Sequence, residues 1–431
     1  MKGARPPVPE PAMLGHMTRV LSLHGRAWHL TRSLRRALFI LALGPLCLEA
    51  RAAPTPSEAS ARAPASSVLF TRACDALEAG DLDGAASHIL TLRQTLPERP
   101  EPRLLESLLA LRRTRPSLGW HDAFIQAWNS IGRPDFRESP WLPEEEEPLA
   151  TGPGPEDVWK QELSAEQRFV VALSMPLDAE RARALIQHLP VVMPPELLVP
   201  IAEYIERDKL PAPVRAQLRA SLRARLAALS ADYPESMQLR ALLLLEGTSD
   251  KAPFTARELQ ELEALSKLSD WRQNDFISLN GYALRHFEAT GISRPENHAY
   301  TVAVMALVSP VPWLLQKRTE ASRDTLTPIE RQHLGEALWR IGSRLAEESS
   351  IVERLVGLNL MKKAATELGD EERLRQATER LTDSRASYAA WQSAVPHHWP
   401  LPSLRTAMIE SSMTDEVAHM HAFRSPKSSA R

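Results

Sequence analysis

The chain has 431 residues, of which 43% are hydrophobic and 25% charged, so it can bury a core and is not disordered over its length. Its 52 Lys and Arg residues against 54 Asp and Glu residues give a net charge of −2. This balance argues against a dedicated nucleic-acid-binding protein, which would need a basic face. The length fits two domains or one elongated domain.

The N-terminal region carries the pattern of a cleaved leader. A basic stretch at 32–36 precedes a mostly apolar run at 37–48, and the small residues Ala50 and Ala52 follow. The run is too short for a membrane-spanning helix, which needs about 20 apolar residues, and has the length of a signal-peptide core. We therefore expect cleavage between Ala52 and Ala53 and a periplasmic or secreted protein. The alternative is an ordinary N-terminal core helix.

Removal of the leader, residues 1–52, changes what remains. The Pro-rich residues ahead of the basic stretch fit neither a leader nor a domain, so we expect translation to start at Met17. The mature chain would keep 44 basic and 52 acidic residues, a net charge of −8. Cys74 would be its only cysteine, so no intramolecular disulfide could form. A cytoplasmic protein with a misread N-terminus is the competing interpretation.

Composition then divides the mature chain. Residues 53–65 are rich in Ala, Pro and Ser, typical of a flexible linker. Residues 139–156 are rich in Pro, Gly and Glu and should separate N-terminal helical hairpins at 66–138 from a helical domain at 157–394. Residues 395–431 form a C-terminal segment with a frayed tail.

Nearly every segment between these linkers predicts helix. No Asn-Gly or Asp-Gly turn separates alternating apolar runs, so strands are not expected. The apolar segment 299–315 is interrupted by Pro310 and Pro312, which predicts a buried helix followed by a turn rather than a membrane span. Capping boxes are predicted at Thr255–Glu258, Ser293–Glu296, Thr327–Glu330 and Ser350–Glu353.

Residues 66–100 contain small and turn-forming residues at regular offsets. Ala73 and Ala85 lie at positions where two helices would cross, Gly80 lies at the turn between them, and Pro97 closes the unit. These residues resemble the tetratricopeptide repeat, a motif of about 34 residues that forms two antiparallel helices. The resemblance implies that Ala73, Gly80, Ala85 and Pro97 serve repeat packing.

Two weaker units extend this resemblance. One places Trp120 and Ala123 at the corresponding positions, and the other has a helix–Gly-Asp–helix pattern at 363–381. The expected fold is therefore all-α, with stacked antiparallel helix hairpins of the α-solenoid type in one or two lobes. An irregular helical bundle is the alternative, because any helical hairpin can use a Gly-Asp turn.

The sequence contains few motifs that indicate catalysis or ligand binding. No phosphate-binding loop, dinucleotide fingerprint, zinc-protease motif or nucleophile elbow is present. His397 and His398, and His419 and His421 near Glu416, are interpreted as solvated residues of the C-terminal segment. No catalytic, cofactor or metal site is therefore predicted.

The chain has ten tryptophans and five tyrosines. Trp120 and Trp128 could line a carbohydrate or peptide groove, but their helical spacing favours core positions between helices. We expect an exported, non-enzymatic helical-repeat scaffold or adaptor that binds another protein or peptide. The alternative is a cell-wall-directed hydrolase on a helical scaffold. A deep cleft with two carboxylates and several tryptophans would favour the enzyme, and a shallow open groove would favour the binding protein.

Overall fold

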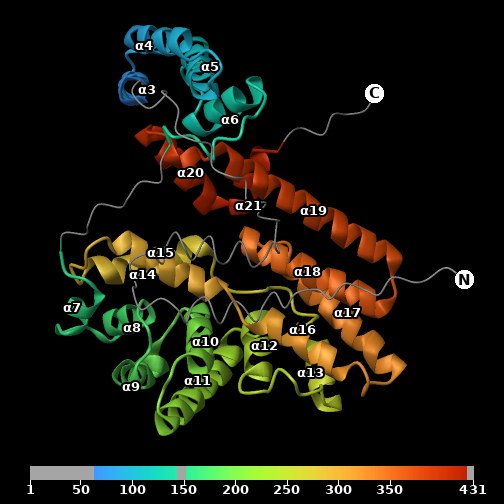
Figure 1. Cartoon of the computed structure of the whole chain (residues 1–431). Coiled ribbons are helices and arrows are strands. Elements are labelled where there is room, and N and C mark those ends of the chain that lie inside the picture. The colour runs from blue at the N-terminus through green and yellow to red at the C-terminus, as the bar shows by residue number, and fades with distance from the viewer. Residues whose placement is uncertain (1–62, 143–151, 425–431) are drawn as a thin grey trace, which may run out of the picture. The chain divides into compact units, whose positions relative to one another are not determined.

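The computed structural model describes residues 63–142 and 152–424, and every regular element within these ranges is a helix (Figure 1). One isolated bridge, between Ser236 and Asp270, is the sole β-type pairing in the described residues. The predicted all-α class is thus confirmed, whereas a solenoid arrangement stays a prediction. The leader, Met17, most of the linker at 53–65 and residues 143–151 of the second linker lie outside the described residues.

The chain divides into two compact units, and the division differs from the one expected from composition. Within the described residues, unit 1 comprises 152–348 and 352–381, and unit 2 comprises 63–142, 349–351 and 382–424. The C-terminal segment thus joins the N-terminal hairpins in one unit instead of standing apart. One boundary falls between the described residues 142 and 152, within the linker expected at 139–156, whereas the last falls inside α19 (Glu371–Ala394) rather than at a linker.

Unit 2 is held together by aromatic packing between its N-terminal segment, 63–142, and its C-terminal segment, 382–424. The ring of Trp399 lies 5.1 Å from that of Phe136 and 5.8 Å from that of Phe124, and all three side chains are buried. Burying such rings explains why the C-terminal segment packs here. Besides the end of α19, its helices are α3 (Ala63–Glu78), α4 (Leu82–Thr95), α5 (Pro100–Thr114), α6 (Trp120–Ser130), η5 (Pro396–His398), α20 (Pro402–Thr414) and α21 (Glu416–Ala422).

Helices α3 and α4 form the hairpin expected from the repeat-like stretch. Ala73 and Ala85 are fully buried in it, so small side chains let the helices approach closely. Gly80 adopts φ = +77° at the turn, a conformation that favours glycine. The Asp81 carboxylate then caps α4 by accepting a hydrogen bond from the Gly84 amide at 2.9 Å. Pro97 is exposed just beyond the end of α4.

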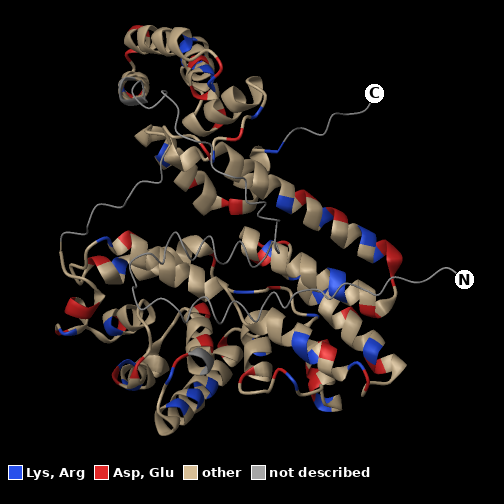
Figure 2. Cartoon of the chain, in the orientation of Figure 1, with Lys and Arg blue, Asp and Glu red and all other residues tan. Residues whose placement is uncertain are grey.

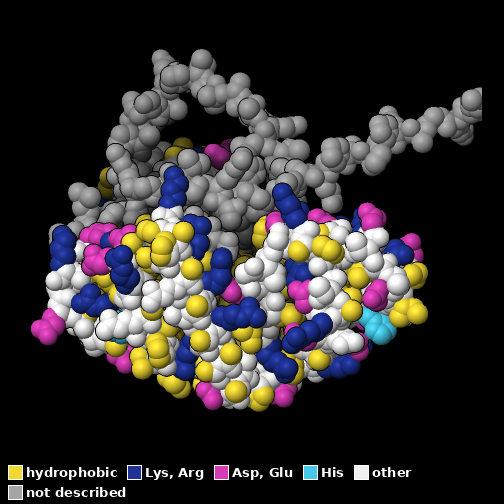
Figure 3. All heavy atoms as spheres, turned by 90° about the horizontal axis from the view of Figure 1, so that it is seen from below, with side chains coloured by type: hydrophobic (Ala, Val, Ile, Leu, Met, Phe, Trp, Pro, Cys, Tyr) yellow, Lys and Arg dark blue, Asp and Glu magenta, His cyan; other side chains and the backbone are white. Residues whose placement is uncertain are grey.

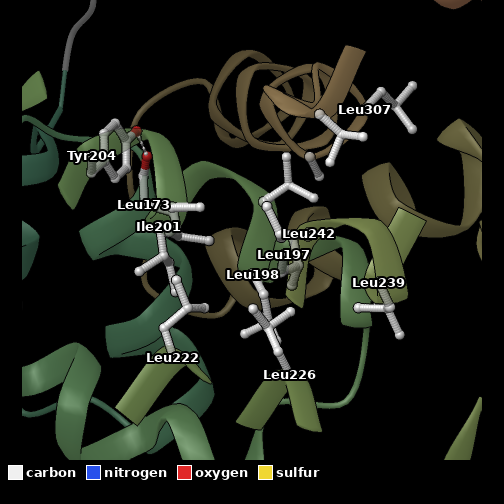
Figure 4. Packing of buried hydrophobic residues seen from close by; sticks show 14 of the residues in the cluster. Leu173, Leu197, Leu198, Ile201, Tyr204, Leu222, Leu226, Leu239, Leu242 and Leu307 are labelled. Atoms are coloured by element: carbon white, nitrogen blue, oxygen red, sulfur yellow. Dashed lines mark hydrogen bonds between the residues drawn. The ribbon is translucent and has the colours of Figure 1, made fainter. Parts of the chain in front are cut away.

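Unit 1 buries a continuous aliphatic core. In Figure 4, leucines of several helices meet around η4 and α10, and the hydroxyl of Tyr204 donates to the carbonyl of Leu173 at 2.7 Å. Its helices are α7 (Pro155–Trp159), α8 (Ala165–Leu173), α9 (Ala179–His188), η3 (Leu189–Val191), η4 (Pro195–Leu198), α10 (Val199–Arg207), α11 (Ala212–Asp232), α12 (Met237–Leu245), α13 (Ala256–Leu265), α14 (Phe276–Glu288), α15 (Pro295–Leu307), α16 (Val311–Ser322), α17 (Pro328–Leu345) and α18 (Ile351–Leu368), followed by the first part of α19.

Two of the predicted capping boxes are confirmed, at Thr255 and Thr327. The box predicted from Ser293 is wrong, because α15 begins at Pro295 and its N-cap is Arg294 in the left-handed conformation. A proline at the first helical position fixes where that helix starts. At the fourth predicted box, Ser350–Glu353, the Ser350 hydroxyl donates a hydrogen bond to Glu416, which also belongs to unit 2.

The apolar segment 299–315 forms the end of α15, a turn and the start of α16, as predicted. Ala299, Val302 and Ala306 are fully buried. By length and composition, 295–322 is the one stretch among the described residues that would suffice to cross a membrane, and 44% of its most apolar part is buried in the unit.

Candidate functional site

An open groove lies in unit 1 where α17 meets the turn between α18 and α19. It encloses about 520 Å³. Its lining is mostly polar, and Figure 2 shows basic and acidic residues interspersed along α19. The lining residues are Pro328, Arg331, Gln332, Glu336, Glu367, Leu368, Asp370 and Arg373.

Two glycines set the distance between the helices that form the groove. A Cβ atom on Gly357 would lie 2.5 Å from the Ala346 amide nitrogen and 2.6 Å from the Gly342 carbonyl oxygen. A Cβ on Gly342 would lie 2.8 Å from the Gly357 carbonyl oxygen. The backbones of α17 and α18 therefore touch at this crossing, which only glycine permits. Gly369, with φ = +65°, then turns the chain into α19.

The carboxylates of the groove are held in ion pairs. Glu336 lies 2.7 Å from Arg373, and Asp370 lies 3.4 Å from the same guanidinium. Glu367 is paired with Arg323 at 2.5 Å. A general acid or base needs a proton-transfer site that is not committed to a permanent cation, so this arrangement suits binding better than catalysis.

Arg331 and Gln332 are exposed polar residues of the first turns of α17, and both line the groove. The guanidinium of Arg373 lies 5.1 Å from the ring centre of Trp339, which fixes the opposite wall. The groove thus combines a rigid, ion-paired wall with an exposed arginine and amide. Such groups can hydrogen-bond the backbone and the carboxylates of an extended polypeptide.

A second cluster of charged residues is buried in the core of unit 1. The Arg272 guanidinium binds both oxygens of Glu353, each at 3.1 Å, and lies 2.8 Å from Glu348. The side chains of Arg272 and Glu353 are only 4% and 3% exposed. Nearby, the Glu196 carboxylate accepts hydrogen bonds from the Gln273 and Asn274 amides.

Burial dominates the electrostatics of this cluster. It raises the pKa of Glu353 to about 7, because the desolvation of the carboxylate outweighs the attraction of Arg272. It also raises the pKa of Glu348, which shares the same arginine. A raised carboxyl pKa can mark a catalytic acid. Here the carboxylate is enclosed and fully bonded to one guanidinium, so we interpret the cluster as an internal cross-link between helices.

The residues expected to matter for the repeat lie at the α3–α4 hairpin described above. The predicted cleavage site, Ala52 and Ala53, lies outside the described residues. The core interpretation of the tryptophans is confirmed for Trp128, which is 1% exposed. Trp120 is half-buried beneath the guanidinium of Arg112, 4.8 Å from its ring centre.

The interpretation of the C-terminal histidines as solvated residues is wrong for His419. This side chain is buried in α21, and its ring lies 5.1 Å from that of His121. The two residues are 298 positions apart, so local sequence could not show the contact. His421, two positions away on the same helix, is exposed. Within 63–142 and 152–424, no group of three or more His, Cys, Asp or Glu side chains is arranged to hold a metal ion.

No family model, curated protein or solved structure matches the chain. The groove itself was not predicted as a site. One signal in the sequence pointed to it, the Gly-Asp turn of the third repeat-like segment, because Asp370 of that turn lines the groove. No such signal indicated the residues of α17 that line the groove, because arginine and glutamine, as at Arg331 and Gln332, are common on any exposed helix face.

Proposed function

We propose that this protein is an exported scaffold that binds an extended, polar segment of another protein in the groove between α17 and the α18–α19 turn. The observation that carries the proposal is the lining of the groove, in which charged and amide side chains predominate and the carboxylates are ion-paired. Small-molecule pockets are lined mainly by apolar and aromatic groups.

The size of the groove supports this class of ligand. A volume of 520 Å³ accommodates a few residues of an extended chain, with Arg331 positioned to pair with an acidic side chain of the ligand. On the face of the molecule in Figure 3, hydrophobic side chains lie scattered among charged ones rather than in one continuous patch. The mostly polar lining of the groove fits a polar peptide segment better than an apolar helix, which would need an exposed apolar groove.

A displayed library of random peptides, selected on the full chain, tests the proposal. Selected peptides should carry acidic residues and should lose at least about tenfold in affinity against the Arg331→Glu variant. Arg340→Glu, an exposed arginine on the same helix outside the groove, is the matched control and should leave affinity unchanged. Equal losses in both variants, or selected peptides that are indifferent to Arg331, would contradict the proposed site.

Export is a separate part of the proposal and has its own measurement. Mass spectrometry of the mature N-terminus, after expression of the chain from Met1 in a Gram-negative host, should find Ala53 as the first residue. A mature chain that retains residues 32–52 and stays in the cytoplasm would refute export while leaving the binding site untouched.

A further inference from the structure

Unit 2 brings a serine, two histidines and an aspartate together from three helices. The Ser411 Oγ atom of α20 lies 3.4 Å from His121 Nε2 of α6 and 3.1 Å from His419 Nδ1 of α21. On its other side, His121 Nδ1 lies 3.0 Å from the Asp122 carboxylate. A hydroxyl, an imidazole that reaches it, and a carboxylate that orients the imidazole are the parts of an activated serine nucleophile.

The protons in this cluster can be placed consistently. His121 Nδ1–H donates to Asp122, which leaves a lone pair on Nε2 to accept the hydroxyl proton of Ser411. His419 Nδ1–H then donates to Ser411 Oγ, and its 3.2 Å contact with His121 Nε2 is the longer branch of a shared hydrogen bond. With both imidazoles neutral, this arrangement gives each of the four groups a partner.

The serine cluster is buried on one side and open to solvent on the other. His419 is 3% exposed, and the ring of the buried Phe423 lies 5.6 Å from it and 6.3 Å from His121. His121 is 17% exposed and Asp122 65% exposed, so the cluster is closed on its aromatic side and reaches solvent on the side of α6. A buried donor such as His419 acts in a low dielectric, where its hydrogen bond holds the Ser411 hydroxyl in place more strongly than one from water would.

We propose that Ser411 is a nucleophile for acyl transfer from carboxylic esters, with His121 as its general base, Asp122 as the group that orients His121, and His419 as a hydrogen-bond donor to the reacting oxygen. This activity is independent of the groove in unit 1, and it goes beyond the binding function proposed above.

The step is balanced by groups that are present. Ser411 Oγ bonds to the ester carbonyl carbon while its proton passes to His121 Nε2, and Asp122 stabilises the imidazolium. When the carbon–oxygen bond to the alcohol breaks, His121 returns that proton to the leaving oxygen. A water molecule then attacks the acyl-serine with His121 again as base, which releases the carboxylic acid and restores the hydroxyl of Ser411.

A fluorophosphonate probe tests the proposal, because an activated serine displaces its fluoride and becomes covalently labelled. We expect labelling of the full, folded chain at Ser411, identified by peptide mass spectrometry, and its loss in Ser411→Ala. His121→Gln should slow labelling by about a hundredfold or more, since the general base is removed. His419→Gln should slow it by a smaller factor. Hydrolysis of p-nitrophenyl acetate should follow the same order.

The chain offers matched controls for this experiment. Ser412→Ala changes the neighbouring serine on α20, and His421→Gln changes the exposed histidine two positions from His419, so both should keep the labelling rate. Thermal unfolding of each variant shows whether unit 2 is still folded, and Ser411→Cys keeps a nucleophile of similar size where Ser411→Ala does not fold. Labelling that persists in Ser411→Ala, that maps to Ser412, or that does not exceed the level in the urea-unfolded chain overturns the proposal.

Discussion

Replacing Arg272 with Met gives the sharpest test of the buried charge cluster in unit 1. The substitution keeps most of the side-chain volume but removes the guanidinium that binds both oxygens of Glu353. The carboxylate would then be left in a site where its side chain is 3% exposed. Breaking one partner out of a buried ion pair costs about 3–5 kcal/mol of unfolding free energy, because the remaining charge has no compensation.

The loss of unfolding free energy in Arg272→Met should depend on pH, and the raised pKa of Glu353 determines the direction of this dependence. A carboxyl group whose pKa is raised on folding, here from 4.5 to about 7, binds its proton more tightly in the folded chain. Its contribution to stability is therefore greatest below about pH 4.5 and declines as pH rises toward 7. Without Arg272 the pKa rises further, so the loss in Arg272→Met should grow from pH 5 to pH 8.

Urea unfolding followed by circular dichroism at pH 5, 6.5 and 8 measures this dependence, with the midpoint and slope compared between variants. The double variant Arg272→Met/Glu353→Gln should recover much of the stability lost at pH 8, because a neutral amide replaces the stranded carboxylate. Arg340→Met, at an exposed position, serves as the control. A loss below about 1 kcal/mol, or one that is equal at all three pH values, would refute the assignment of Glu353 as a buried partner of Arg272.

Three further predictions follow from single contacts. Gly357→Ala should force α17 and α18 apart and lower stability by about 1–3 kcal/mol in thermal unfolding, whereas Gly281→Ala, where a Cβ meets only a side-chain atom at 3.9 Å, should be neutral or stabilising. Glu258→Gln should lower the free energy of unfolding by about 2 kcal/mol at pH 7, because Arg318 and the capping interaction lower the pKa of Glu258 to about 2. In acid-unfolding titrations this difference between the variant and the original chain should vanish as pH falls toward 2. Burial raises the pKa of the Cys74 thiol, so Ellman's reagent should react with it only after unfolding; rapid reaction in the native chain would contradict its placement.

Local signals in the sequence predicted local structure well. Thr255 and Thr327 cap their helices as expected, because a capping box involves residues only three positions apart. The same pattern failed at Ser293, where Pro295 fixed the start of the helix and placed Arg294 at the cap instead. A capping pattern is thus decisive only when no stronger constraint lies within the same turn.

Contacts between segments that lie far apart in the chain could not be predicted from the sequence. Gly342 and Gly357 lie in stretches without any turn signal, and their role appears only when α17 and α18 cross. His121 lies beside Asp122 in the sequence, but nothing near these two residues indicates Ser411 or His419. The groove and the serine cluster are each built from side chains of separate helices, whose packing depends on the whole core rather than on any one segment.

The division of the chain inside α19 has a consequence for biosynthesis. Helices α3–α6 are translated early, yet the buried aromatic partners of unit 2, among them Trp399 and Phe423, are translated only after the whole of unit 1. At about 5–20 residues per second, the first hairpins wait tens of seconds with their apolar faces uncovered. The helices that are synthesised first are therefore the last to pack into a finished core. A chain that ends within α19 would lack the C-terminal residues against which α3–α6 pack.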